Sequence, residues 1–305
     1  MGSLPTVLEP SIAGLELHRP GRMPWQRLLA ITLSLALLIA LGLVLREQGF
    51  ARLRGALPHA PAFWIAFAFY YFALPVSEWV IYRRLWRLPP AAFAALLRKL
   101  VSNEMLLGYS GELSFYLYAL RSGRLAASPF KAIKDVSILS AMAGNVATLL
   151  MVAVAWPIWR SWRPGFMPAG SLPSLGLLLA LCVLLMVLRR RIFSLPPHHL
   201  RFVGSVHLIR VAFTTALLGI MWTAALPQVP VAIWIALAAL QLVVSRLPFV
   251  PNKDIVFAGT AMLFVGQATP IGALMALVAS LLVAAHLFIG LGLIVTDVAG
   301  VAENK

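Results

Sequence analysis

Two short polar stretches interrupt otherwise apolar parts of this chain, and they hold the residue types that could do chemistry. One spans residues 103–112 and the other spans residues 246–254. Ionisable side chains within a membrane segment are costly and are functional candidates by default. We therefore predict a polar substrate-binding site at these two breaks. Its candidate residues are Asn103, Tyr109, Ser110, Gly111, Glu112, Arg246, Asn252, Lys253 and Asp254.

The first break is suited to a turn that carries an acid. Gly108 and Gly111 permit tight turning and close helix approach, and Tyr109 and Ser110 add hydroxyl groups. Helix N-termini freed by such a turn favour an anionic group. Glu112 has two open interpretations. It is either a charge that interacts with the dipole of the next helix, or a carboxylate that binds a proton or contacts substrate.

The second break combines helix breakers with fixed charges. Two prolines end the preceding helix, and Asn252 and Asp254 are suitable caps for the next one. Lys253 can be neutralised by Asp254, or it can act with Arg246 to bind a lipid phosphate or pyrophosphate. Because a basic group at depth needs a partner, we expect Glu112 to pair with Arg246 or Lys253 across the molecule.

The remaining polar residues of the apolar segments are expected to have mainly structural partners. The expected pairs are Glu104 with Arg98 or Lys99, Glu78 with Tyr82 or a nearby arginine, and Asp135 with Lys131. Arg210 is expected to extend to the lipid head groups. We expect Asn145, Gln241 and His286 to form hydrogen bonds between helices.

The composition indicates the kind of structure that must position these residues. Of 305 residues, 61% are hydrophobic and only 11% are charged, whereas soluble domains carry about 25% charged residues. Long continuous apolar runs exclude a β-barrel. We therefore predict an all-α polytopic membrane protein. A helix needs about 20 apolar residues to cross the hydrocarbon, and the predicted full spans are Arg27–Leu45, Pro61–Tyr82, Ala132–Trp156, Ser174–Leu188, Val206–Leu226 and Ile271–Val295.

Residues 91–120 and 231–266 are also apolar, but the breaks divide each into arms too short to span. We interpret each as a re-entrant helical hairpin. The order span, span, hairpin, span then occurs twice, in residues 27–157 and 174–296. Three full spans per half predict inverted repeats, a transporter signature with the site between the repeats. A shift of 142 residues places Glu112 on Asp254 and Ser110 on Asn252.

The basic residues predict the orientation. The net charge is +15, but the basic residues lie in short clusters between apolar runs, which favours membrane insertion over nucleic-acid binding. With the N-terminus in the cytoplasm, 17 of the 25 Lys and Arg residues fall on the cytoplasmic side and five on the outside. We predict a multi-pass protein of the bacterial inner membrane with both termini cytoplasmic. Residues 1–25 and 298–305 are the expected tails of a single membrane domain, residues 26–297.

The two breaks resemble a known family. Asn103 and Gly111-Glu112, followed much later by the sequence Leu-Pro-Phe-Val-Pro at 247–251, are similar to the membrane region of bacterial lysylphosphatidylglycerol synthase/flippase proteins. Here Asn252 and Lys253 stand where the family usually has glycines. The resemblance covers most of the chain and implies movement or recognition of a lipid with a charged or glycosylated head group. It implies a stand-alone member without the synthase domain.

These observations predict a lipid or lipid-linked-glycan flippase whose partners are membrane lipids. One alternative is a non-catalytic scaffold or lipid-sensing subunit of an envelope-synthesis complex. The other is a membrane enzyme that uses Glu112 or Asp254 as a general base on a lipid-linked substrate. The sequence contains no P-loop, HExxH or CxxC pattern, so no cofactor or metal is predicted and a non-enzymatic role is favoured.

Overall fold

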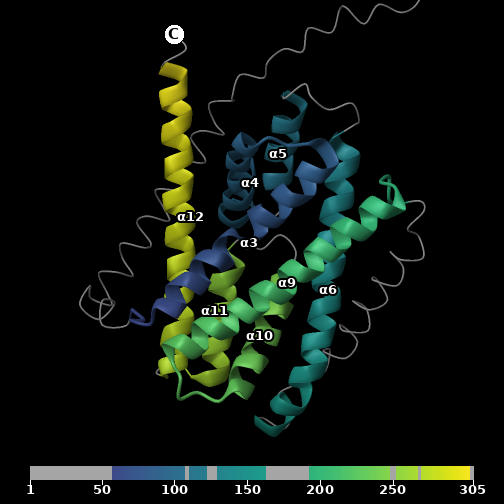
Figure 1. Ribbon diagram of the computed structural model, residues 1–305. Helices are drawn as coiled ribbons and strands as arrows, with labels where there is room; N and C mark the ends of the chain where they lie inside the picture. Colours follow the sequence, from purple (N-terminus) through teal and green to yellow (C-terminus); the bar gives the residue numbers. More distant parts are fainter. Residues whose placement is uncertain are drawn as a thin grey trace, which may run out of the picture. The chain divides into compact units, whose positions relative to one another are not determined.

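The computed structural model describes residues 57–106, 110–121, 129–162, 192–247, 252–266 and 269–302. All of these residues belong to one structural unit, Val44–Lys305. The described part is helical and has no strand (Figure 1). Its α-helices are α3 (Pro61–Trp86), α4 (Phe93–Met105), α5 (Ser110–Arg121), α6 (Pro129–Trp162), α9 (Pro197–Ala225), α10 (Val231–Ser245), α11 (Lys253–Val265) and α12 (Pro270–Ala302), with a short 3-10 helix at Pro90–Ala92.

Four of these helices, α3, α6, α9 and α12, are long and apolar enough to cross a membrane. Each begins at a proline, which is favoured at the first helical position because the missing N–H has no partner there anyway. The shortest of the four has 26 residues and is about 39 Å long at 1.5 Å per residue. The four spans predicted in this part of the chain are confirmed as helices. Those predicted at 27–45 and 174–188 lie outside the described residues.

The helices at the two breaks are shorter. They have 13 residues in α4, 12 in α5, 15 in α10 and 13 in α11. At 1.5 Å per residue, each is about 18–23 Å long, less than the ~30 Å of a bilayer core. Figure 1 shows α4 and α5 beside one half of the long helices and α10 and α11 beside the other half. The predicted hairpins are therefore present, and they occupy opposite halves of the described part.

The described helices follow the order long, short, short, long twice. The first set is α3, α4, α5 and α6, and the second set is α9, α10, α11 and α12. Helices of one set also pack against helices of the other. The first arm of each hairpin packs on the last long helix of the other set, α4 on α12 and α10 on α6. At the first crossing, Gly290 of α12 approaches Val101 of α4. At the second, the Thr148 hydroxyl of α6 is 3.4 Å from the Leu242 carbonyl oxygen of α10. The 142-residue shift maps Thr148 onto Gly290, so the two crossings correspond.

Candidate functional site

The two hairpin tips touch through their backbones. The Asn252 N–H donates a hydrogen bond to the Glu104 carbonyl oxygen, with N and O 3.0 Å apart. Asn252 has the left-handed φ of 49°, which asparagine tolerates better than most residues. This conformation turns the chain into α11 directly beyond the contact. Two residues 148 positions apart in the sequence are thereby brought together, as the predicted site requires.

At the first tip, polar side chains fasten the start of α5 to the end of α4. The Ser110 hydroxyl donates to the Ser102 carbonyl oxygen at 2.8 Å, and the Gly111 N–H donates to Asn103 Oδ1 at 2.7 Å. Gly111 is required for this approach because a Cβ there would overlap the backbone of Lys99. Asn103 and Ser110 therefore hold the turn in place, and their predicted contact with substrate stays a prediction.

We expect Gly111→Ala to destabilise the protein by about 1–3 kcal/mol, the usual range for overpacking a tight contact. The obstacle is backbone, which cannot rotate away. Gly259→Ala in α11 is the matched control because a Cβ there meets nothing within 4 Å. Thermal unfolding in detergent measures both variants. Equal melting temperatures for the two would contradict the described packing of α5 on α4.

A buried ion cluster lies behind this tip. Lys99 Nζ of α4 is 2.5 Å from Glu78 Oε1 of α3 and 3.4 Å from Glu112 Oε1 of α5. The Lys99 and Glu78 side chains are only 3% and 7% exposed, whereas Glu112 is 21% exposed. One lysine thus contacts two carboxylates: Glu78 is buried and Glu112 is partly exposed. The second Glu112 oxygen, Oε2, is buried and has no hydrogen-bond partner among the described residues.

The second tip holds its carboxylate with an amide. Gln241 Nε2 of α10 donates to Asp254 Oδ1 of α11 at 2.7 Å. Lys253 Nζ donates to the Ser245 carbonyl oxygen at 2.9 Å. The Arg246 guanidinium donates to the Ser245 hydroxyl through Nε at 3.1 Å and Nη2 at 2.8 Å. The bonds of Gln241 and Lys253 link α10 to α11, so they tie the arms of the second hairpin together as Lys99 ties those of the first.

The two clusters occupy equivalent places in the repeated order. The 142-residue shift maps Lys99 and Glu112 onto Gln241 and Asp254, so a first-arm side chain holds a second-arm carboxylate in each hairpin. The pairs differ in charge: the first contains a cation and the second a neutral amide. Both pairings could have been found by extending the shift from the acids to the preceding helix.

Several predicted partners are wrong. Glu112 pairs with Lys99 and not with Arg246 or Lys253. The reason is that α5, which carries Glu112, packs against α4, which carries Lys99. Lys99 is also the partner of Glu78, for which Tyr82 or an arginine was expected. The Asn252 side chain makes no capping hydrogen bond, since its backbone turns away into the left-handed region. Asp254 bonds to Gln241.

Arg210 and Asp135 have contacts that were not predicted. Arg210 is half-buried, and its Nη2 donates to the Ser140 hydroxyl of α6 at 3.1 Å, so its predicted contact with head groups stays a prediction. Asp135 is fully buried and ties α6 to the segment before α9. Its Oδ2 accepts hydrogen bonds from the backbone N–H groups of Ser194 and Leu195, each at 2.7 Å. Its ion pair is with Lys134, at 3.3 Å, in place of Lys131.

The remaining predictions have mixed outcomes. Gln241 bonds between helices as expected, and so does His286, whose Nδ1 is 3.0 Å from the Tyr71 hydroxyl. Tyr109 lies outside the described residues. Among the residues that the structure describes, no group of three or more His, Cys, Asp or Glu is placed to hold a metal ion. The site described so far is therefore one of fixed charges and hydrogen-bonding groups.

No family model, curated protein or solved structure matches this chain. The resemblance to the lysylphosphatidylglycerol synthase/flippase membrane region therefore stays a prediction that rests on its motif residues. Function has to be inferred from the two hairpin tips and from the groups around them.

Proposed function

We propose that this chain is a membrane transporter of flippase type that carries a polar lipid head group past the joined hairpin tips. The backbone contact between Asn252 and Glu104 is the observation on which this proposal chiefly rests. It joins two short helical hairpins from opposite halves of the molecule. Carboxylates and basic groups lie on both sides of the contact, and the long helices beside them are apolar enough to cross a membrane.

The cost of burying these groups supports a functional interpretation. Lys99 and Glu78 are nearly inaccessible, and Asp254 and Lys253 lie only partly exposed next to the tip. Charged groups inside a membrane are expensive, and a well-packed apolar pair is often at least as stable as a buried ion pair. Stability alone therefore does not account for the cluster. A head group that must cross the membrane interior needs polar partners there, and the tips offer them.

The packing of each hairpin against the other set of helices suggests how the tips could be opened to one side of the membrane at a time. Each hairpin packs against the last long helix of the other set, so relative movement of the two sets would open one side of the tips and close the other. Rocking of repeats about a midplane site is a common transporter mechanism. In this scheme the backbone contact at Asn252 is made in one state and altered in the other.

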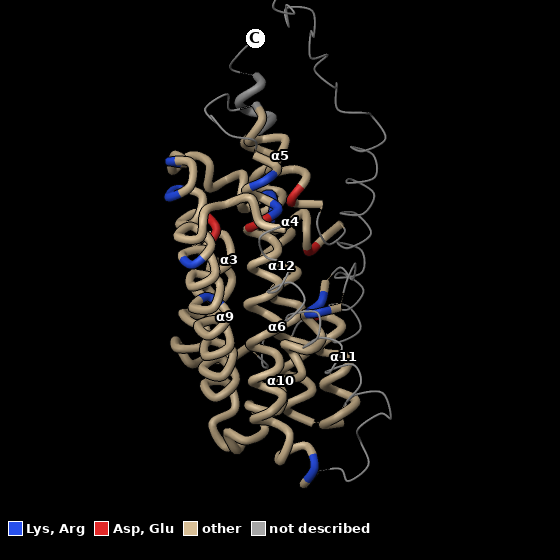
Figure 2. Tube along the Cα trace, turned by 90° about the vertical axis from the view of Figure 1, so that its right-hand side faces the viewer, with Lys and Arg blue, Asp and Glu red and all other residues tan. Residues whose placement is uncertain are grey.

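We further propose that the end holding α4 and α5 faces the cytoplasm of a bacterial cell. Figure 2 shows basic residues concentrated toward that end, while the opposite end of the long helices is mostly free of charge. Arg83 and Arg84 in the last turn of α3 contribute to this bias. Excess Lys and Arg on cytoplasmic loops is the usual rule for inner-membrane proteins. This orientation agrees with the one predicted from the sequence.

The proposal predicts that Glu112→Gln lowers lipid transport about tenfold, as expected when a charge-assisted contact worth ~1.4 kcal/mol is lost. Glutamine keeps the size of the side chain and removes its charge. The measurement is movement of a labelled phospholipid between leaflets of proteoliposomes that contain the full chain. Lys131→Gln is the control because Lys131 is an exposed residue near the start of α6.

Three outcomes would count against the proposal or its details. Wild-type protein that moves no lipid faster than protein-free liposomes would favour the scaffold alternative. Conversion of the added lipid to a new product would favour the enzyme alternative. Transport that is unchanged in Glu112→Gln, with a melting temperature equal to that of wild type, would remove this carboxylate from the mechanism.

A further inference from the structure

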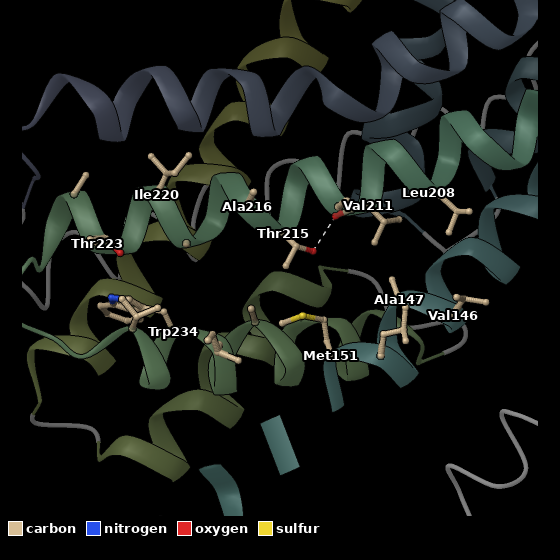
Figure 3. Close-up of a pocket in the computed structure, with 17 residues that line it drawn as sticks. Val146, Ala147, Met151, Leu208, Val211, Thr215, Ala216, Ile220, Thr223 and Trp234 are labelled. Atoms are coloured by element: carbon tan, nitrogen blue, oxygen red, sulfur yellow. Dashed lines mark hydrogen bonds between the residues drawn. The ribbon is translucent and has the colours of Figure 1, made fainter. Parts of the chain in front are cut away.

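The geometry points to a binding site for an anionic membrane lipid, formed by an apolar groove between α6, α9 and α10 and by two arginines beyond its end. The groove has a volume of about 980 Å³, which is within the size range of ligand pockets. Its lining is almost wholly apolar. Figure 3 shows Thr215 on the side of α9 that faces Met151 and Ala147 of α6. The Thr215 hydroxyl donates to the Val211 carbonyl oxygen at 2.8 Å, so it offers no donor to a ligand.

One stripe of α6 connects the groove with the two arginines. Ser140, Gly144, Ala147 and Met151 are spaced by four, three and four residues, so they lie on one helix face. Ala147 and Met151 line the groove. Ser140 accepts the hydrogen bond from Arg210. The stripe therefore changes along its length from an apolar wall to a surface contacted by arginine.

Gly144 is where the second arginine meets this stripe. The Arg246 guanidinium lies so close to Gly144 that any added Cβ would overlap it. Four residues separate Ser140 from Gly144, which is about 6 Å along a helix axis. The anchoring points of Arg210 and Arg246 are thus about one helical turn apart, although Arg210 belongs to α9 and Arg246 directly follows α10. Arginine's planar fork is the side chain best suited to hold a phosphate through two hydrogen bonds.

The face of α10 leads to the same place. Ala238 lines the groove, and Arg246 is the C-cap residue of α10, eight residues later. Two walls of the groove therefore run from apolar residues toward the guanidinium groups. This arrangement complements a molecule with a long apolar part and an anionic end.

The occupant that fits is a membrane glycerophospholipid, with one acyl chain in the groove and its phosphate at Arg210 and Arg246. The proposed function is needed only for the further step of regarding this lipid as the transported cargo. Binding itself can be measured without transport. The site also assigns a role to Arg210, a residue that the sequence patterns place at the membrane surface.

Lipid binding to the full chain in detergent, measured by native mass spectrometry, tests this site. The probes are phosphatidylglycerol and a diacylglycerol with the same acyl chains but no phosphate. We expect one phosphatidylglycerol to bind at least tenfold more tightly than the diacylglycerol. The double variant Arg210→Gln/Arg246→Gln should lose this preference. The control variant Arg160→Gln/Arg201→Gln removes two exposed arginines and should keep it.

Two further variants keep the test decisive if the double variant fails to fold. Arg246→Lys retains the positive charge but not the planar fork, and we expect a threefold to tenfold loss of affinity. Gly219→Leu adds a side chain at a groove-lining position where a Cβ meets nothing within 4 Å. It should lower the affinity for both probes without lowering the melting temperature.

Several results would overturn the site. They are equal binding of the two probes by wild type, equal losses in the double variant and its control, and unchanged affinity in Gly219→Leu. A lower melting temperature for Gly219→Leu would mean that the added side chain overlaps protein atoms. The groove would then have no room for a lipid. Tight, arginine-dependent binding without any lipid movement would contradict the proposed transport function while leaving the binding site intact.

Discussion

Replacing Lys99 with methionine is expected to lower the free energy of unfolding by about 3–5 kcal/mol, the usual result of removing one partner from a buried ion pair. Lys99 is the only cation in ion-pair contact with Glu78 or Glu112 among the described residues. Without it, two carboxylates face each other, and Glu78 has almost no access to water. Both the unpaired burial and the repulsion between like charges act against the folded state.

A second substitution separates this explanation from a simple packing defect. In the double variant Lys99→Met/Glu78→Met the buried carboxylate is removed together with its partner. Most of the lost stability should return, because apolar replacement of a buried ion pair is often neutral. Lys131→Met is the control for loss of a basic residue at an exposed position. Chemical or thermal unfolding in detergent provides the measurement. A Lys99→Met variant no less stable than Lys131→Met would contradict the ion cluster.

The arrangement of the helices was largely predictable from the sequence. Hydropathy and length identify the long helices, since each crosses an apolar layer of fixed thickness. The hairpins were predictable because Pro248, Pro251 and the glycines near residue 110 interrupt apolar runs at equivalent places. The predicted ends were less accurate. The helix expected to begin at Val206 begins nine residues earlier, at Pro197, because polar residues can extend a helix beyond the hydrocarbon.

The partners of the site residues were harder to predict. The sequence predicts that Glu112 pairs with Arg246 or Lys253 across the repeats, but it forms its ion pair with Lys99 of its own hairpin. A charged residue reaches several neighbours on a helix bundle, and hydropathy does not indicate which helices are adjacent. Arg210 shows the same limit. Its place near the end of a predicted span favours contact with head groups, but its hydrogen bond to Ser140 of α6 depends on the packing of α6 against α9.

The contact between the tips offers a direct means of stopping the proposed movement. Backbone groups that share a hydrogen bond belong to residues whose Cα atoms are roughly 5–6 Å apart, a separation that a disulfide can bridge. The two residues that share this hydrogen bond are Glu104 and Asn252. The double variant Glu104→Cys/Asn252→Cys is therefore expected to form a disulfide on mild oxidation. It requires Cys182→Ser as background because Cys182 is the only native cysteine.

In that variant, the most direct measurement is lipid movement in proteoliposomes before oxidation, after oxidation and after renewed reduction. If the hairpin tips separate during each transport cycle, oxidation should lower the rate to that of protein-free liposomes and reduction should restore it. Each single-cysteine variant should be insensitive to the same treatment. Complete disulfide formation with an undiminished rate would show that the tips do not separate, and it would contradict transport through this site.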